Sequence, residues 1–383
     1  MEKILVIGGG IVGSSVVTFL KSFGLTDITI SEESANIKTY HNLLGVNTLT
    51  SYSGKGGLGN FWHNVIDFGL IDFKNQDADL VKIFKLISNM KPKIILSNHE
   101  IVPYSPIRPN NLMEKLKNHL AYVPKCIRLS KNKDSVNATF EGCDLVKRFD
   151  RVFVCNGAMN SADILINSGM ADRNETVSDH IIFYENDVKK LDKNSMEYLK
   201  VSRGNGYFSR PYHVIKNVKI TFRPVYPGGE SRILKNRAIY NNNKLDIAFK
   251  LLNPANFMQS FETIYLRYGL LFPTSKYRRF AQTVVDQCYY WDKKKLIVDE
   301  SRVDKAANEL SQCGLNISTA AGVSGIHYFN TIKNLDNSVG GFNNKTDAKI
   351  VLFSASHLFE PGPHHFTFKL IVDSYKVIKS IYQ

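Results

Sequence analysis

A glycine-rich turn near the start of the chain has the spacing of a phosphate-binding cradle. Gly8, Gly10 and Gly13 follow the continuous apolar run Ile4–Ile7 and precede an apolar helical stretch. In a G-x-G-x-x-G pattern the first glycine permits a tight turn and the second lets the backbone approach a pyrophosphate. The third lets the helix pack close to the strand. The N-terminus of that helix offers unpaired N–H groups and a partial positive charge to an anion.

The residues after this turn supply the setting of a dinucleotide site. The pattern predicts a helix over residues 11–23 with Gly24 as its stop signal, then a strand over residues 27–31 that ends at Glu32. An acidic residue about 20 positions past the glycines is where such sites hold a ribose hydroxyl. The alternative is an accidental glycine cluster between a strand and a helix. We favour a bound dinucleotide, and the spacing leaves open which one.

A second glycine-rich stretch lies at residues 56–62 and is too dense in glycine for a helix or a strand. It suggests close backbone approach to something flat or charged, and hence a cofactor that more than one segment contacts. The alternative is a surface turn. The candidate contacts here are Gly56, Gly57, Asn60, Phe61 and Trp62.

Two adjacent histidines lie near the C-terminus. The pattern predicts a buried strand over residues 348–353, a loop over residues 354–365 that ends in His364 and His365, and a closing helix over residues 366–382. Loops at the carboxyl ends of parallel strands are where α/β sheets bind ligands. An imidazole, with a pKa of about 6.5, can accept or donate a proton near neutral pH. The alternative for each histidine is a structural role, with its ring hydrogen-bonded to the backbone.

The composition is that of a soluble globular chain with excess positive charge. Its 383 residues suffice for two domains, or for one large domain with an insertion. Lysine and arginine number 49 against 35 acidic residues, which gives a formal net charge of +14. This charge is either a solvated basic surface or a means of attracting phosphate-bearing substrates or an anionic membrane surface. No nucleic-acid-binding module is recognisable, so we expect no nucleic-acid partner.

The five cysteines are scattered and lack C-x-x-C spacing, which argues against a disulfide framework and a zinc site. We expect no metal. No apolar run reaches membrane-spanning length, and no signal peptide precedes the first strand. These features favour a cytoplasmic protein.

The pattern predicts an α/β fold with a Rossmann-like domain that is split in the sequence. After a β-meander over residues 127–154, a strand, the turn at Gly157 and a helix repeat the arrangement of the N-terminal cradle. Residues 176–302 have a different texture, typical of an inserted α+β domain on an antiparallel sheet. We therefore expect a discontinuous cofactor-binding domain over residues 1–175 and 303–383. In the inserted domain, arginines and tyrosines either face a ligand or decorate an exposed sheet face, and our candidates are Arg210, Arg223 and Tyr226.

The order of these parts resembles the glucose–methanol–choline type of FAD-dependent oxidoreductases. The cradle with Glu32, the segment 56–62, the segment 152–161 and the short segment 177–180 are similar to successive motifs of that family. Residues 327–331 resemble its His-x-x-Gly-Thr segment, and residues 354–367 resemble its closing segment. The sequence departs from the family at Asn330, where the family has glycine, and at Phe366, where proline often stands.

The resemblance implies the cofactor and the site residues. It implies noncovalent FAD, with His327 standing over the flavin as the base and His365 completing the pair; His364 is one residue away. It also implies flavin contacts from both glycine stretches and from the closing segment. The full cofactor-binding set is Gly8, Gly10, Ile11, Val12, Gly13, Glu32, Gly56, Gly57, Asn60, Phe61, Trp62, Gly157, Ser356, His365, Phe366 and Thr367.

We therefore expect an FAD-dependent oxidoreductase that oxidises a CH–OH group of a small molecule, with a carbohydrate or a nucleotide-linked sugar as substrate. Two alternatives stay open at this point. One is a flavin-dependent sugar mutase or isomerase without net oxidation. The other is a flavin-binding protein with no catalytic activity. The oligomeric state and the electron acceptor cannot be inferred from the sequence.

Overall fold

The structure is a computed structural model of the 383-residue chain. It describes residues 2–32, 36–38, 51–53, 56–57, 65–69, 78–88, 90, 98–103, 107–116, 120–187, 189–190, 202–204, 207–224, 276–293, 295–317, 323–324, 327–342 and 347–383.

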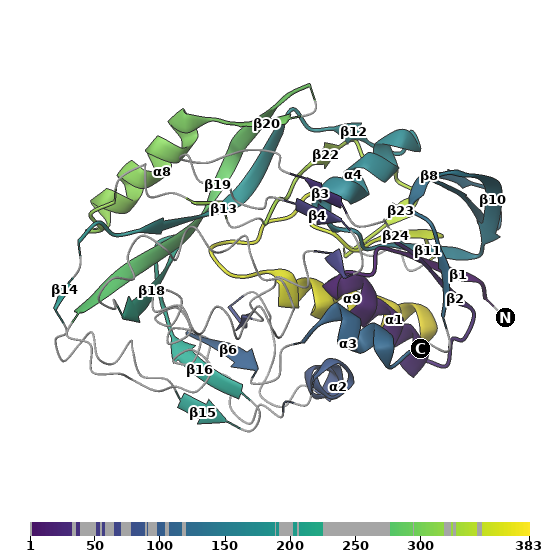
Figure 1. Ribbon diagram of the computed structural model, residues 1–383, viewed down its shortest axis with the longest axis horizontal. Coiled ribbons are helices and arrows are strands. Elements are labelled where there is room, and N and C mark those ends of the chain that lie inside the picture. The colour runs from purple at the N-terminus through teal and green to yellow at the C-terminus, as the bar shows by residue number, and fades with distance from the viewer. Residues whose placement is uncertain are drawn as a thin grey trace, which may run out of the picture.

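A six-stranded parallel sheet organises the part of the molecule that contains both termini (Figure 1). Its strands are β1 (Ile4–Ile7), β2 (Ile28–Ser31), β7 (Ala121–Val123), β11 (Arg151–Val154), β23 (Val339–Gly340) and β24 (Ile350–Leu352). They follow the order β23-β24-β11-β1-β2-β7, and every pair is parallel. Segments from both ends of the sequence therefore share one Rossmann-like sheet.

Both faces of this sheet are covered, which explains the continuous apolar run in β1. Ile4 and Val6 lie in one apolar cluster with α1 (Ile11–Ser22) and α9 (Thr367–Tyr382). Leu5 and Ile7 lie in a second cluster on the other face, because successive strand residues point to opposite sides. That second face is covered by α4 (Gly157–Asn167) and by a meander of β8 (Cys126–Lys131), β9 (Val136–Phe140) and β10 (Cys143–Phe149).

The helical layer is held together by aromatic contacts. α1 packs on α9 with the rings of Phe19 and Tyr375 in an edge-to-face contact at 5.1 Å. Phe84 of α2 (Ala78–Ile87) stacks on Phe368 of α9, also at 5.1 Å. The short helix α3 (Pro109–Glu114) has proline in its first turn, where the missing N–H is not needed.

A seven-stranded antiparallel sheet forms the second large layer (Figure 1). Its strands are β13 (Thr176–Tyr184), β14 (Lys189–Lys190), β17 (His213–Ile215), β18 (Val218–Pro224), β19 (Lys276–Asp292), β20 (Lys295–Val298) and β21 (Val323–Ser324). α8 (Glu300–Gln312) places Val303, Ala307 and Leu310 in the same apolar cluster as Phe183 and Tyr289 of this sheet.

A four-stranded sheet brings segments more than a hundred residues apart together. It comprises β5 (Ile66–Asp67), β6 (His99–Pro103), β15 (Ser202–Gly204) and β16 (Tyr207–Pro211), in the order β15-β16-β6-β5. Two smaller antiparallel pairs are β3 (Asn36–Lys38) with β4 (Ser51–Ser53), and β12 (Asp172–Arg173) with β22 (Ile332–Lys333). The predicted α/β class is thus confirmed, with an antiparallel sheet beside the parallel one. In the part of the chain that is described, no helix combines the length and the apolar character needed to cross a bilayer.

Candidate active site

The N-terminal glycines form the close-packed turn that their spacing predicts. Gly8 has φ +95°, a left-handed conformation that favours glycine, and a Cβ there would lie 2.6 Å from the Cα of Asn156. A Cβ on Gly13 would lie 1.8 Å from the carbonyl oxygen of Gly8. Gly10 is different, because the nearest described atom to a Cβ there is the carbonyl oxygen of Gly56, 3.9 Å away. As far as the described residues show, the turn is therefore tightly packed at Gly8 and Gly13 and open at Gly10.

Glu32 connects this turn to the second glycine stretch. It follows β2, and its Oε1 accepts a hydrogen bond from the backbone N–H of Gly56 at 2.8 Å. The same oxygen would lie 2.4 Å from a Cβ on Gly9, so the carboxylate lies directly over the turn. Gly56 and Gly57 have φ values of +83° and +50°. The open space at Gly10, the acid at the end of β2 and the two glycine segments together fit a dinucleotide.

The third loop at this edge of the sheet begins where β11 ends. Gly157, with φ +79°, is the first residue of α4. Asn156 precedes it, abuts Gly8 and accepts a hydrogen bond from the Ser161 hydroxyl at 2.8 Å. Ile11 and Val12, in the first turn of α1, are buried. The N-terminus of α1 has no side-chain cap.

Three imidazole rings lie together in the C-terminal part of the site. The ring centroid of His327 is 5.8 Å from that of His365 and 5.7 Å from that of His180. His180 lies on β13 and is fully buried. His364 instead directs its Nδ1 to the carboxylate of Asp67. The structure thus brings His365, rather than His364, next to His327.

Two of these rings are neutral near pH 7. Burial lowers the pKa of His180 to about 4, against the opposing effect of a hydrogen bond between its Nε2 and the carbonyl oxygen of Gly362 at 2.6 Å. Since a carbonyl only accepts, the hydrogen of His180 is on Nε2. Burial also lowers the pKa of His365 well below its ordinary value, and the positive charge of Lys219 adds to this effect.

A buried carboxylate fixes the backbone beside His327. Oδ1 of Asp179 accepts a hydrogen bond from the backbone N–H of His327 at 2.8 Å, and its Oδ2 accepts one from the Tyr289 hydroxyl at 3.2 Å. Asp179 is fully buried. This contact ties the segment that carries His327 to β13.

Asn330 has the conformation that the family's glycine would supply. Its φ is +53°, a region that asparagine tolerates better than other residues with a Cβ. Its Oδ1 accepts from the N–H of Phe359 at 2.7 Å, and its Nδ2 donates to the carbonyl of Phe359 at 3.1 Å. Asn330 therefore holds a left-handed turn and links the two histidine segments through two hydrogen bonds.

The closing segment packs against the same rings. Phe366, at the start of α9, has its ring centroid 5.3 Å from that of His327, 5.5 Å from that of His180 and 4.8 Å from that of Phe359. Ser356 is fully buried, and its carbonyl accepts from the N–H of Ile332 at 3.0 Å. Thr367 is the first residue of α9.

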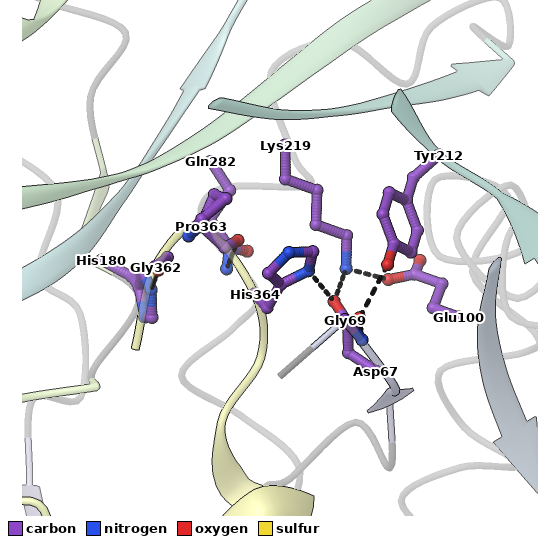
Figure 2. A network of polar contacts seen from close by, with 10 residues as sticks. All are labelled: Asp67, Gly69, Glu100, His180, Tyr212, Lys219, Gln282, Gly362, Pro363 and His364. Atoms are coloured by element: carbon purple, nitrogen blue, oxygen red, sulfur yellow. Dashed lines mark hydrogen bonds and ion pairs between the residues drawn. The ribbon is translucent and has the colours of Figure 1, made fainter. Parts of the chain in front are cut away.

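A buried polar cluster lies next to the histidines (Figure 2). Nζ of Lys219, on β18, is 2.6 Å from Oδ2 of Asp67 and 2.8 Å from Oε2 of Glu100. The Tyr212 hydroxyl donates to Oδ1 of Asp67 at 2.9 Å, and Nδ1 of His364 lies 3.1 Å from Oδ2. The side chains of Asp67 and Glu100 are fully buried, and that of Lys219 is 1% exposed. The cluster therefore joins the four-stranded sheet, the antiparallel sheet and the C-terminal loop.

The cluster sets the charge states of its members. Burial would raise the pKa of Asp67, but Lys219 and His364 outweigh it and hold that pKa well below its usual range. Burial, reinforced by the negative charge of Asp67, raises the pKa of Tyr212 well above its ordinary value. Asp67 is thus an ionised acceptor, and Tyr212 keeps the proton that it donates.

Some expected site residues lie outside the described part of the chain. Asn60, Phe61, Trp62 and Tyr226 are not among the described residues, and neither are the side chains of Arg210 and Arg223. Within the described residues, no group of three or more histidine, cysteine, aspartate or glutamate side chains could hold a metal ion.

Sequence reasoning missed His180 and the Asp67 cluster. His180 ends the short segment 177–180 that carries part of the family resemblance, so its position was a usable signal. Lys219 lies between Val218 and Ile220 in a strand, an alternation that by itself predicts an exposed lysine. Its burial beside Asp67 depends on contacts between distant segments, which no local pattern encodes.

The fold of the chain is similar to that of a known flavin oxidase. No family model matches the sequence, and no curated protein sequence does. Solved structures do match over the full length, among them pyridoxine 4-oxidase from Mesorbium loti, with a TM-score of 0.53, 9% identity and 99% of each chain covered. The chain has the fold of this oxidase. Pyridoxine 4-oxidase is of the glucose–methanol–choline type, so the resemblance predicted from the motifs is confirmed at the level of the fold.

Two further structures match the whole chain at lower TM-scores. An FAD-dependent oxidoreductase from Chaetomium thermophilum has a TM-score of 0.49 and 8% identity, with 99% of each chain covered. A formate oxidase from Aspergillus oryzae has a TM-score of 0.48 and 10% identity, covering 99% of this chain and 98% of that one.

Removing the ammonium group of the buried cluster should destabilise the protein strongly. In Lys219→Met, Asp67 and Glu100 lose the cation that they share in a dry environment, and we expect a loss of about 3–5 kcal/mol in the free energy of unfolding. Urea denaturation measures the loss. The matched control is Lys333→Met, because Lys333 pairs with Glu175 at the surface and such pairs contribute about 0–1 kcal/mol. Equal small losses in the two variants would contradict this view of the cluster.

The neutral state of His180 predicts a loss of stability in mild acid. The unfolded chain binds a proton at this imidazole near pH 6.5, whereas the folded chain does so only near pH 4. The free energy of unfolding should therefore fall by up to about 3 kcal/mol between these pH values as the pH drops. Urea titrations at successive pH values measure this slope. His180→Gln, whose amide can still donate to Gly362, should show a shallower slope, and an unchanged slope would count against the assignment.

Proposed function

We propose that this chain is an FAD-dependent oxidoreductase that oxidises a CH–OH group of a small molecule. The observation that carries the proposal is that three loops leave the same edge of one parallel sheet. The Gly8 turn follows β1, the Gly157 turn follows β11, and the loop that ends at His365 follows β24. The carboxyl ends of adjacent parallel strands form the ligand-binding edge of α/β sheets. A dinucleotide held by the first two loops would thus extend toward the histidines of the third.

The cradle supports FAD as the dinucleotide. Gly8, Gly10 and Gly13 would hold the pyrophosphate with the N–H groups of Ile11 and Val12, and Glu32 would bind the ribose of the adenosine half. The fold is that of an oxidase, and the family that the motifs resemble uses FAD. We propose that binding is noncovalent. The remaining flavin contacts would come from Gly56, Gly57, Asn60, Phe61, Trp62, Gly157, Ser356, His365, Phe366 and Thr367.

His327 and His365 would have different roles toward the substrate hydroxyl. Bound FAD supplies a hydride acceptor, so the chain itself must bind the alcohol and remove its hydroxyl proton. We assign proton removal to His327. The lowered pKa of His365 makes it a weak base, and it would instead exchange a hydrogen bond with the substrate hydroxyl. We propose His365 rather than His364 as the second member of this pair, a choice supported by the contact of the His364 ring with Asp67.

The substrate that we propose is a carbohydrate or a nucleotide-linked sugar. The net charge of +14 favours a phosphate-bearing ligand. Arg210 and Arg223 lie on β16 and β18, in the part of the chain that we propose to bind substrate, and Tyr226 follows β18. We propose that residues 1–175 and 303–383 form the flavin domain and residues 176–302 the substrate domain. α8 crosses the boundary at residue 303 and packs on the antiparallel sheet.

An alanine at Gly10 should separate cofactor binding from folding. Gly10 has φ −64°, which alanine adopts freely, and its Cβ would meet nothing described closer than 3.9 Å. The melting temperature of the apoprotein should be unchanged, while the methyl group blocks the approach of the pyrophosphate and lowers the affinity for FAD about 100-fold. Fluorescence titration of the apoprotein with FAD measures the affinity.

The control for this variant is Gly341→Ala. Gly341 follows β23, the edge strand of the same sheet, and its Cβ would make a contact of 3.4 Å with the carbonyl oxygen of Leu352. FAD should bind this control as it binds the wild type. If Gly10→Ala also bound FAD with unchanged affinity, the cradle would not hold the pyrophosphate and the proposed cofactor site would be wrong.

Replacing His327 should slow reduction of the flavin without loss of the cofactor. In His327→Gln the base is absent, and we expect anaerobic reduction by an alcohol donor to be at least about 100-fold slower. Stopped-flow absorbance measures the rate constant. The control is His357→Gln, because Nδ1 of His357 lies 3.4 Å from the backbone carbonyl oxygen of Ile332 and we assign this ring no part in the chemistry.

Unchanged reduction in His327→Gln would refute its role as the base. Turnover of a sugar only after prior reduction of the flavin would instead favour a mutase.

A further inference from the structure

Three consecutive residues before His365 are each held by a polar contact from a different place in the fold (Figure 2). The carbonyl of Gly362 accepts from Nε2 of His180 at 2.6 Å. The carbonyl of Pro363 accepts from Nε2 of Gln282, a buried residue of β19, at 3.0 Å. The ring of His364 meets the Asp67 carboxylate at 3.1 Å. His365 follows immediately, and its ring lies next to that of His327.

The carboxylate of Asp67 has no remaining capacity for a substrate. Oδ1 accepts from the Tyr212 hydroxyl at 2.9 Å and from the N–H of Gly69 at 3.0 Å. Oδ2 accepts from Lys219 at 2.6 Å and from His364 at 3.1 Å. An ionised carboxylate offers about four lone-pair sites. Asp67 is therefore a fixed acceptor, and Nδ1 of His364 carries the hydrogen in their contact.

The position of the His364 ring is also fixed by its shape. A Cβ on Gly69 would lie 2.3 Å from Cε1 and 2.6 Å from Nδ1 of His364. The ring thus packs directly on the backbone of Gly69, and only glycine leaves room for it. Gly69 is itself tied to Asp67 through its N–H, so the ring has both a polar and a steric limit on its position.

We propose that Asp67 and Gln282 are positioning residues that act through His364 and Pro363, respectively, to hold the His365 ring against His327. This inference rests on the proposed function, in which these two rings handle the substrate proton. Asp67 sets the position of His364, Gln282 sets that of Pro363, and the buried ion pair with Lys219 keeps Asp67 in place. The chain thus uses two sheets outside the cofactor cradle to fix one ring in the active site.

The first test needs neither flavin turnover nor a known substrate. In ¹⁵N-histidine-labelled protein, the imidazole resonances of His365 are assigned by their loss in His365→Gln. They should shift in Asp67→Asn, which leaves Lys219 paired with Glu100, and in Gln282→Met, which keeps the side-chain length and removes the amide. They should stay unchanged in the control Glu185→Gln. Glu185 is a buried carboxylate that pairs with Arg279 and Lys189 of the same antiparallel sheet. Unchanged His365 resonances in both Asp67→Asn and Gln282→Met would overturn the proposal.

A second variant guards against a failure of Asp67→Asn to fold. Gly69→Ala retains every charge of the cluster and should displace the His364 ring, because the new methyl group would lie only 2.3 Å from its Cε1. It should shift the His365 resonances in the same way. Resonances of His365 that match the wild type in folded Gly69→Ala would show that His364 does not set the position of its neighbour.

The second test uses the holoenzyme and an alcohol donor that reduces the wild-type flavin. The limiting rate constant for reduction should fall about 100-fold in Asp67→Asn and Gln282→Met, since displacing a catalytic group by about 1 Å has an effect of this size. The dissociation constant of the donor should rise far less than the rate constant falls, since His365 contributes one hydrogen bond to the donor hydroxyl. Both parameters should stay unchanged in Glu185→Gln. A weaker donor affinity with an unchanged limiting rate would contradict a positioning role. If no donor reduces the wild-type flavin, the proposed function fails, and the histidine resonances still decide whether Asp67 and Gln282 position the His365 ring.

Discussion

Parallel pairing of β1 with β11, and of β11 with β24, is the constraint on which the arrangement of the site depends. It brings residues from the start, the middle and the end of the sequence into three adjacent strands that point the same way. Their carboxyl ends therefore release the Gly8 turn, the Gly157 turn and the histidine loop at one edge. The close contact between Gly8 and Asn156 shows how tightly the first two of these loops pack. This topology therefore brings the Gly8 cradle and the histidine loop to the same edge of one sheet.

The second feature that shapes the site is the buried polar cluster around Asp67. Burial removes the charged groups of Asp67, Glu100 and Lys219 from water, which is unfavourable. The attraction between these charges compensates for the lost solvation only when the geometry is good. Here Asp67 has four donors, and its neighbours come from three separate parts of the fold. Such an arrangement tolerates few alternative packings. It fixes how the four-stranded sheet, the antiparallel sheet and the C-terminal loop fit together, and so it fixes the surroundings of His365.

Local chemistry made part of this structure predictable. The apolar run Ile4–Ile7 predicts a strand, and the glycine spacing predicts the tight turn that follows it. The structure contains both, and it places the carboxylate of Glu32 over that turn. The strand at the C-terminus and the closing helix were also predictable from periodicity. His365 and His327 could be paired only through the family resemblance, because 37 intervening residues separate them and no local pattern joins them.

The rest of the site depends on contacts that no local pattern encodes. Asp67 lies in a two-residue strand, and its partners Tyr212, Lys219 and His364 follow about 150 to 300 residues later. Asn330 looked like a departure from the family, and only its positive φ shows that it serves the turn that a glycine would serve. The choice between His364 and His365 likewise required the structure, since adjacent residues in a loop can point to either side.

The most direct test of the central claim is the visible absorption spectrum of the purified protein, recorded before and after anaerobic addition of sugars and nucleotide-linked sugars. We predict an oxidised flavin spectrum that bleaches with at least one of these CH–OH donors, and the donor that bleaches it identifies the substrate class. The absence of a flavin spectrum even after incubation with FAD would refute FAD binding at the Gly8 cradle and, with it, the proposed function.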